Sequence, residues 1–121
     1  MPPAFEPAST DALYLSWKLP ATEPAVIARA QRRLWSGEAR RLYRLRSWVI
    51  VSGEVRALVA PATSLEGVVN AIWGAGAEPV ATRWIPTRDC ARIARDIETA
   101  PVSLGLAERP ERWPLSSAAC L

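Results

Sequence analysis

Histidine is absent from this chain of 121 residues. Without it, the chain has no imidazole to act as a general acid or base, to activate a serine or cysteine nucleophile, or to bind a metal ion. The sequence also lacks a GxxxxGK[ST] loop, and the GAG at 74–76 follows a predicted helix, whereas a dinucleotide loop follows a strand. We therefore expect no enzymatic activity, no cofactor and no metal site.

Cysteines and long apolar runs are also scarce. Cys90 and Cys120 lie far apart and form no CxxC motif, which indicates neither a disulfide framework nor a zinc site. The longest apolar stretches, such as WVIV (48–51), are far shorter than the roughly 20 residues of a membrane-spanning helix. The N-terminus MPPAFEPASTDA has no basic region before an apolar stretch, so it does not resemble a secretory signal. We expect free thiols and a cytoplasmic protein without membrane contacts.

Arginine, in contrast, is plentiful and unevenly distributed. The net charge is +3, and Lys18 is the only lysine among 15 basic residues. The segment RAQRRLWSGEARRLYRLRSW (29–48) holds seven arginines against one acidic residue, Glu38. A local excess of one charge predicts either a solvated helix face or a surface for an anionic partner.

The first part of the chain predicts a strand and a helix. In LYLSWKL (13–19) apolar and polar residues alternate, as in a half-buried strand, and Pro20 ends the pattern. Thr22 and Glu23 before Pro24 then predict a helix start, because proline is tolerated in the first turn. The apolar stripe of this helix consists of Ile27, Ala30 and Leu34.

Where this helix ends is left open by the sequence. Ser36-Gly37 could end it, or it could continue to about Leu42. From Tyr43 the segment is rich in β-forming residues, and Ser52-Gly53 separates it from EVRALVA as a short turn would. This pattern predicts a hairpin.

The second half predicts two more helices and a strand. Thr63 and Glu66 have the spacing of a capping box, which predicts a helix that ends at Gly74 and Gly76. Pro79 precedes a last strand, VATRWI (80–85). The spacing of apolar residues predicts a third helix over 87–99 with Thr87 as its cap, and prolines from residue 101 onward predict an irregular tail.

This element order predicts a ferredoxin-like βαββαβ sandwich of the α+β class. It would have a four-stranded antiparallel sheet with two helices on one face, an open opposite face, an extra C-terminal helix and an irregular tail. We expect a Pro-rich arm (1–11), one domain (12–99) and a Pro-containing tail (100–121).

The arginine-rich segment supplies a candidate nucleic-acid site. If one helix ran unbroken through Gly37, four arginines would fall within about 60° of one another. Four phosphate contacts would give a log–log salt slope of about −3.6 on duplex DNA. The alternative is a helix face and a strand whose arginines simply point to water. The four candidates are Arg29, Arg33, Arg40 and Arg44.

The octapeptide LYLSWKLP (13–20) resembles the first-strand motif of RNA-recognition-motif domains. The resemblance implies that Tyr14 stacks on a base. It departs from the family at Trp17, which takes the place of an asparagine, and EVRALVAP carries none of the family's stacking aromatics. Pro2 could act as the N-terminal base known from the tautomerase superfamily, but a loop-like arm separates it from the first predicted strand.

Tryptophan is the other abundant residue type, with six copies. Trp113, in the Pro-rich stretch ERPERWPL, is hard to place in a core, so we predict that it anchors a partner together with Tyr14. The function expected from the sequence is a small non-catalytic binding or regulatory module that acts through a protein partner and self-associates, as in a homodimer. The alternatives are a nucleic-acid-binding accessory protein that uses the segment 29–46, and a small-molecule sensor domain.

Overall fold

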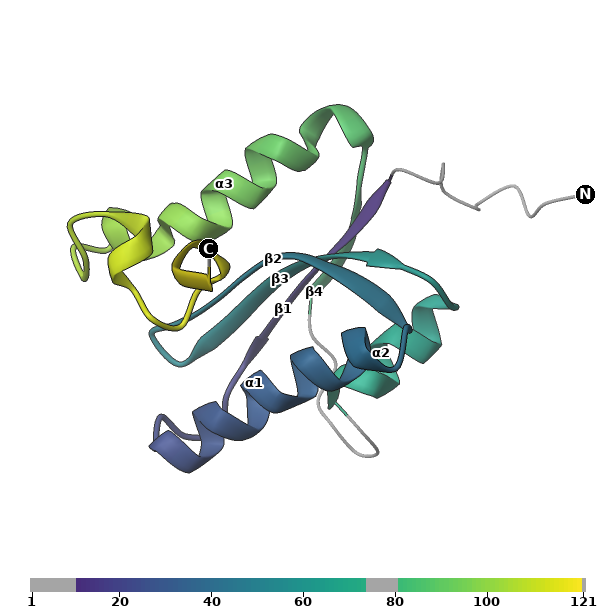
Figure 1. The fold of residues 1–121 in the computed structure, drawn as a ribbon, viewed down its shortest axis with the longest axis horizontal. Coiled ribbons are helices and arrows are strands. Elements are labelled where there is room, and N and C mark those ends of the chain that lie inside the picture. Colours follow the sequence, from purple (N-terminus) through teal and green to yellow (C-terminus); the bar gives the residue numbers. More distant parts are fainter. Residues whose placement is uncertain (1–10, 74–80, 121) are drawn as a thin grey trace, which may run out of the picture.

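A four-stranded antiparallel sheet lies between two layers of helices in the computed structural model (Figure 1). The structure describes residues 11–73 and 81–120, so the expectations for residues 1–10, Gly74, Gly76, Pro79 and Val80 lie outside it. The elements are β1 (Ala12–Lys18), α1 (Pro24–Ala39), β2 (Tyr43–Val51), β3 (Glu54–Pro61), α2 (Leu65–Trp73), β4 (Ala81–Ile85), α3 (Thr87–Ser103), η1 (Pro110–Arg112) and η2 (Ser117–Cys120).

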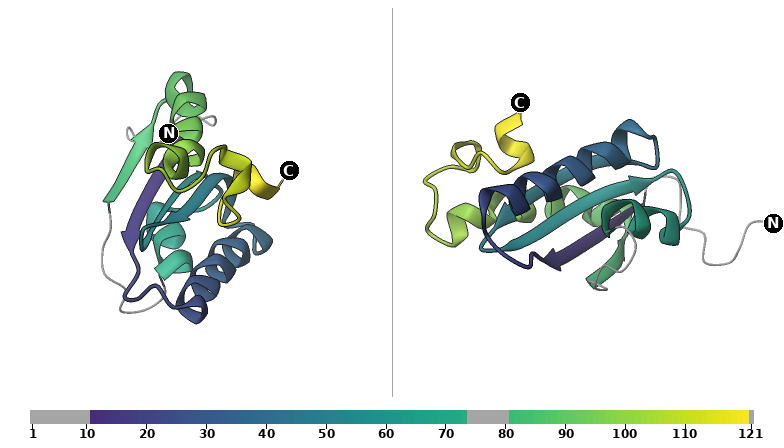
Figure 2. Two further views of the ribbon diagram at one scale, coloured as in Figure 1. Left: turned by 90° about the vertical axis from the view of Figure 1, so that its left-hand side faces the viewer. Right: turned by 90° about the horizontal axis from the view of Figure 1, so that it is seen from below.

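The strand order is β2-β3-β1-β4, and every neighbouring pair is antiparallel. The helices α1 and α2 cover one face of the sheet, and α3 lies on the other (Figures 1 and 2). The α+β class with a four-stranded antiparallel sheet and three helices is therefore confirmed. The expectation of an open opposite face was wrong for β2 and β3, because α3 packs over these two strands.

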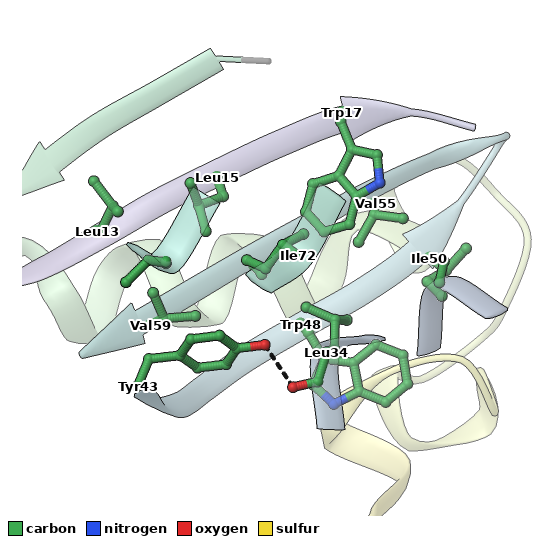
Figure 3. Packing of buried hydrophobic residues seen from close by; sticks show 13 residues of the cluster. Leu13, Leu15, Trp17, Leu34, Tyr43, Trp48, Ile50, Val55, Val59 and Ile72 are labelled. Carbon is green, nitrogen blue, oxygen red and sulfur yellow. Dashed lines mark hydrogen bonds between the residues drawn. The ribbon is translucent and has the colours of Figure 1, made fainter. Parts of the chain in front are cut away.

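The larger core lies between the sheet and the pair α1 and α2 (Figure 3). The alternation predicted for β1 sends Leu13, Leu15 and Trp17 into this core, while Lys18 is exposed. From α1 come Ala30 and Leu34, as the helical stripe predicted. A smaller cluster on the opposite face joins Val49, Val51 and Leu58 to α3.

The hairpin turn between β2 and β3 lies at Ser52-Gly53, as predicted. Both residues have positive φ, 52° and 73°, which is the signature of a type I′ turn. This turn follows the right-handed twist of the strands, so it sets the register in which Val51 faces Glu54.

Two helix starts differ from the predicted ones. The N–H of Gly67 donates to Ser64 Oγ at 3.0 Å, so Ser64 caps α2 in place of the predicted Thr63. The N-cap of α3 is Pro86, which has no side-chain donor or acceptor. Instead, Asp11 Oδ1 accepts hydrogen bonds from Thr87 N and Thr87 Oγ1 at 3.1 and 3.0 Å. A capping residue so far away in the sequence gives no local signal.

The third helix runs past its predicted end at residue 99 and includes Pro101. Proline cannot donate the hydrogen bond to the preceding turn. The helix nevertheless continues, and the N–H of Leu104 donates to Ala100 O at 3.0 Å. Residues 100–103, predicted as part of the tail, therefore belong to α3.

The tail that follows α3 is anchored along the outer edge of β2. The N–H of Ile50 donates to Leu115 O at 2.8 Å, and Ser116 forms a β-bridge with Val49. The Ser117 hydroxyl accepts from Trp48 N at 3.0 Å and donates to Glu98 Oε2 at 2.5 Å. The tail predicted as irregular is thus a fixed cap on an edge strand, which blunts its capacity to pair with another chain.

Candidate nucleic-acid interface

The helix α1 does not stop at Gly37. Gly37 is buried, and a Cβ atom there would lie 2.3 Å from the ring of Tyr43. The helix ends after Ala39, and the chain reverses at Arg41, which has a φ of 61°. Glycine at position 37 therefore lets an aromatic ring pack against the helix backbone and does not terminate the helix.

Three of the four candidate arginines share one flank of α1. At 3.6 residues per turn, Arg29, Arg33 and Arg40 fall within about 40° of one another. Arg40 forms the C-cap of α1, whereas Arg44 lies on β2. The prediction that all four arginines lie on a single helix is therefore wrong for Arg44, because the chain turns between Arg40 and Arg44.

The arginines of this segment nevertheless share one property, exposure to solvent. On β2, a bulge between Leu45 and Ser47 shifts the register at Arg46. We call the seven residues the arginine surface, and they are all exposed: Arg29, Arg32, Arg33, Arg40, Arg41, Arg44 and Arg46. They span the outer side of α1, the turn after it and the start of β2.

Glu38, the acidic residue within this segment, forms a hydrogen bond with the backbone of β2. Its Oε2 accepts a hydrogen bond from Leu45 N at 2.8 Å, which ties the end of α1 to the start of β2. One carboxylate among seven guanidinium groups leaves the region strongly positive. A surface of this kind attracts polyanions.

Tyr43, the first residue of β2, links the two elements that carry the arginine surface. Its ring is buried, and its hydroxyl donates to Leu34 O at 2.5 Å (Figure 3). Burial, and next the nearby charge of Glu38, raise the pKa of Tyr43 above its ordinary value of 10.0. The hydroxyl thus stays protonated and joins β2 to α1 directly beneath the arginine-bearing turn.

We expect Tyr43→Phe to lower the free energy of unfolding by about 1 kcal/mol, because it removes a buried hydrogen bond and keeps the ring. The raised pKa adds a pH dependence. The unfolded chain ionises Tyr43 near pH 10 while the folded chain retains the proton, so stability falls as the pH rises above that value. Urea denaturation at about pH 8 and pH 11 should show a larger alkaline loss for the unmodified protein than for the Tyr43→Phe variant. An equal alkaline loss of stability in both proteins would contradict a raised pKa of Tyr43 in the folded chain.

Trp35 adds an aromatic ring at the border of the arginine surface. It is 45% exposed and packs edge-to-face on Trp48, with ring centroids 6.3 Å apart. Aromatic rings beside a basic groove stack on nucleobases in many single-strand-binding proteins. The sequence signal for Trp35 is its position directly after two arginines in RRLW (32–35).

The two predicted partner residues lie on the other side of the sheet. Trp113 is half-buried, and its Nε1 donates to Ile50 O at 2.8 Å. Tyr14 is half-buried, and the guanidinium carbon of Arg83 lies 5.6 Å from its ring centroid. Both residues pack against the cluster under α3.

No protein-family model matches the chain, and no curated protein matches it. One solved structure is similar over 97% of this chain and 82% of its own, with a TM-score of 0.66. It is that of a REP-associated tyrosine transposase bound to a REP hairpin, and the two sequences are 12% identical. At this identity the similarity shows a shared fold alone.

The described residues contain no group of three or more cysteine, aspartate or glutamate side chains that could hold a metal ion. Cys90 is a buried free thiol whose Sγ lies 3.4 Å from Pro86 O. Within residues 11–73 and 81–120, no helix is long and apolar enough to cross a membrane.

Proposed function

We propose that this protein binds nucleic acid through the arginine surface and catalyses no reaction on it. The observation that carries the proposal is the exposure of all seven arginines around the turn between α1 and β2. Phosphate contacts by arginine supply most of the affinity of sequence-independent nucleic-acid binding. The exposed Trp35 beside them offers a face for stacking.

The fold similarity supports the same class of ligand. The transposase that shares the fold is described as bound to a hairpin, and the match extends over 97% of this chain. A scaffold of this shape can therefore hold nucleic acid. We further infer that the four strands, in the order β2-β3-β1-β4, and the helices α1 and α2 form a ferredoxin-like sandwich to which α3 and the tail are added.

The contacts of Trp113 are the reason to rank nucleic acid above a protein partner anchored by that residue. Its indole N–H is already used within the chain, on Ile50 O. All seven arginines of the arginine surface, in contrast, are exposed, whereas Trp113 is half-buried. A protein partner and self-association remain separate proposals that would need another anchor.

We expect the protein to bind a hairpin oligonucleotide with an affinity that falls steeply as salt is raised. Because each phosphate contact contributes about −0.9 to the log–log slope, Arg29→Glu, Arg33→Glu and Arg40→Glu together should reduce the slope's magnitude by about 2.7. Affinity at low salt should fall at least about tenfold. Fluorescence anisotropy over a series of salt concentrations measures both quantities.

The matched control carries three charge reversals outside the arginine surface, at Arg95, Arg109 and Arg112, all of which are exposed. It has the same net charge as the test variant. If the control loses as much affinity as the test variant, the binding depends on net charge and not on this surface. Absence of binding at low salt would refute the proposal.

A further inference from the structure

The two edges of the sheet differ in how they are covered. The tail pairs with the outer edge of β2, through the hydrogen bond from Ile50 to Leu115 and the bridge between Val49 and Ser116. The strand β4 forms the opposite edge (Figure 2). Among residues 11–73 and 81–120, β1 is the only strand that pairs with β4. The backbone groups of β4 that face away from β1 are therefore available to another strand.

The strand β4 also lacks the features that commonly prevent pairing at an exposed edge, which are proline, lysine and bulges. Its sequence, ATRWI, contains neither proline nor lysine, and its register with β1 is continuous. Its one charged residue, Arg83, leans back over β1, where its guanidinium carbon lies 5.6 Å from the ring centroid of Tyr14. The positive charge therefore lies away from the free edge.

The side chains of β4 are exposed on both faces of the sheet. Residues 81–84 are all exposed, although successive side chains of a strand point to opposite faces. Trp84 pairs with Leu13, so it lies on the face that α1 and α2 cover, and it is 38% exposed. Thr82, two residues earlier, lies on the same face. This edge thus combines unpaired backbone groups with an exposed tryptophan, a residue type that is enriched at protein interfaces.

We propose that β4 pairs in antiparallel orientation with β4 of a second copy of this chain, so that the two sheets join into one. A twofold axis perpendicular to the sheet relates the copies. Directly opposite residues then face the same side of the joined sheet, so both have odd numbers or both have even numbers. The arginine surfaces of the two copies lie toward opposite ends of this sheet, because β2 is the strand farthest from β4.

The residues of β4 select one register. An axis through Arg83 would set two guanidinium groups directly opposite each other, which destabilises a strand pair. An axis through Trp84 would set Thr82 opposite Pro86, which has no N–H to donate. An axis through Thr82 instead forms a threonine pair and sets Arg83 opposite the small Ala81. Trp84 then lies diagonal to Thr82 of the second copy, within reach of its ring.

This self-complementarity is the reason to choose a second copy over an unrelated peptide. The contact is small, because β4 has five residues. Interfaces below about 1,200 Å² are commonly weak and transient. We therefore expect a reversible dimer. In sedimentation equilibrium of the full chain, the average mass should rise from that of one copy toward that of two as the concentration is raised. A mass of one copy at every concentration would overturn the proposal.

Charges at position 82 test the pairing and its register. In Thr82→Asp or Thr82→Lys alone, like charges face each other across the axis, so the dissociation constant of the dimer should rise about fivefold or more. An equimolar mixture of the two variants sets opposite charges face to face and should recover association. Recovery also shows that both variants are folded, since Thr82 is exposed and its replacement leaves the core unchanged.

The matched control introduces the same charges at Ser36, which is exposed on α1. This helix packs on α2 and on β2, the edge strand farthest from β4. Ser36→Asp and Ser36→Lys should dimerise as the unmodified chain does, and an equal loss in these variants would overturn the proposal. So would full association of each Thr82 variant alone, or a mixture that stays monomeric. None of these outcomes depends on nucleic-acid binding, so the arginine surface is tested separately.

Discussion

Gly37→Ala is expected to lower the free energy of unfolding by about 2 to 3 kcal/mol. An alanine in place of a helical glycine ordinarily stabilises a helix by about 1 kcal/mol. Here the added methyl group would lie 2.3 to 2.4 Å from three atoms of the Tyr43 ring, Cε2, Cζ and Oη. The ring is 1% exposed and bonded to Leu34, so it cannot move aside without breaking that bond and opening the core. Urea denaturation measures the difference.

A double-mutant cycle shows whether the ring is the cause. In a Tyr43→Leu background the obstructing atoms are absent, so Gly37→Ala should be neutral or stabilising. A coupling energy near zero would show that the loss of stability in Gly37→Ala does not arise from the Tyr43 ring. The exposed Ser36→Ala substitution on the same helix controls for helix propensity and should change stability by less than about 0.5 kcal/mol.

Trp113→Ala is expected to cost about 2 to 3 kcal/mol of folding stability. The indole packs on the cluster under α3, and its Nε1 donates to Ile50 O at 2.8 Å. Truncating a fully buried tryptophan costs about 3 to 5 kcal/mol, and Trp113 is half-buried, so a value at or below the lower limit is expected.

Trp113→Phe separates the two contributions. Phenylalanine keeps an aromatic ring and loses the N–H donor, so its cost should be about 1 kcal/mol. Thermal and urea unfolding should therefore rank the variants in the order unmodified, Trp113→Phe, Trp113→Ala. If Trp113→Ala folds as stably as the unmodified protein, the indole is not an internal anchor, and its role as a partner contact regains support.

Much of the fold could be predicted from local patterns. The alternation in β1 and the apolar stripe of α1 placed Leu13 and Leu34 in the core, and Ser52-Gly53 marked a turn that needs positive φ. Gly37 was ambiguous because glycine both ends helices and admits a close neighbour. Only the position of the Tyr43 ring decides between the two meanings.

What the sequence could not show depends on residues far apart in the chain. The cap of α3 comes from Asp11, and the anchor of the tail comes from Ile50. The arginine-rich segment was visible, but its division between α1 and β2 follows from the reversal at Arg41.

The cap on the edge of β2 has a consequence for the order of events during synthesis. The backbone N–H of Trp48 cannot form its hydrogen bond to Ser117 Oγ until Ser117, 69 residues later in the chain, has been synthesised. At about 5 to 20 residues per second, a ribosome needs several seconds to supply that partner. During this interval the outer edge of β2 lacks the pairing that Leu115 and Ser116 later provide, so it is open to pairing with another chain.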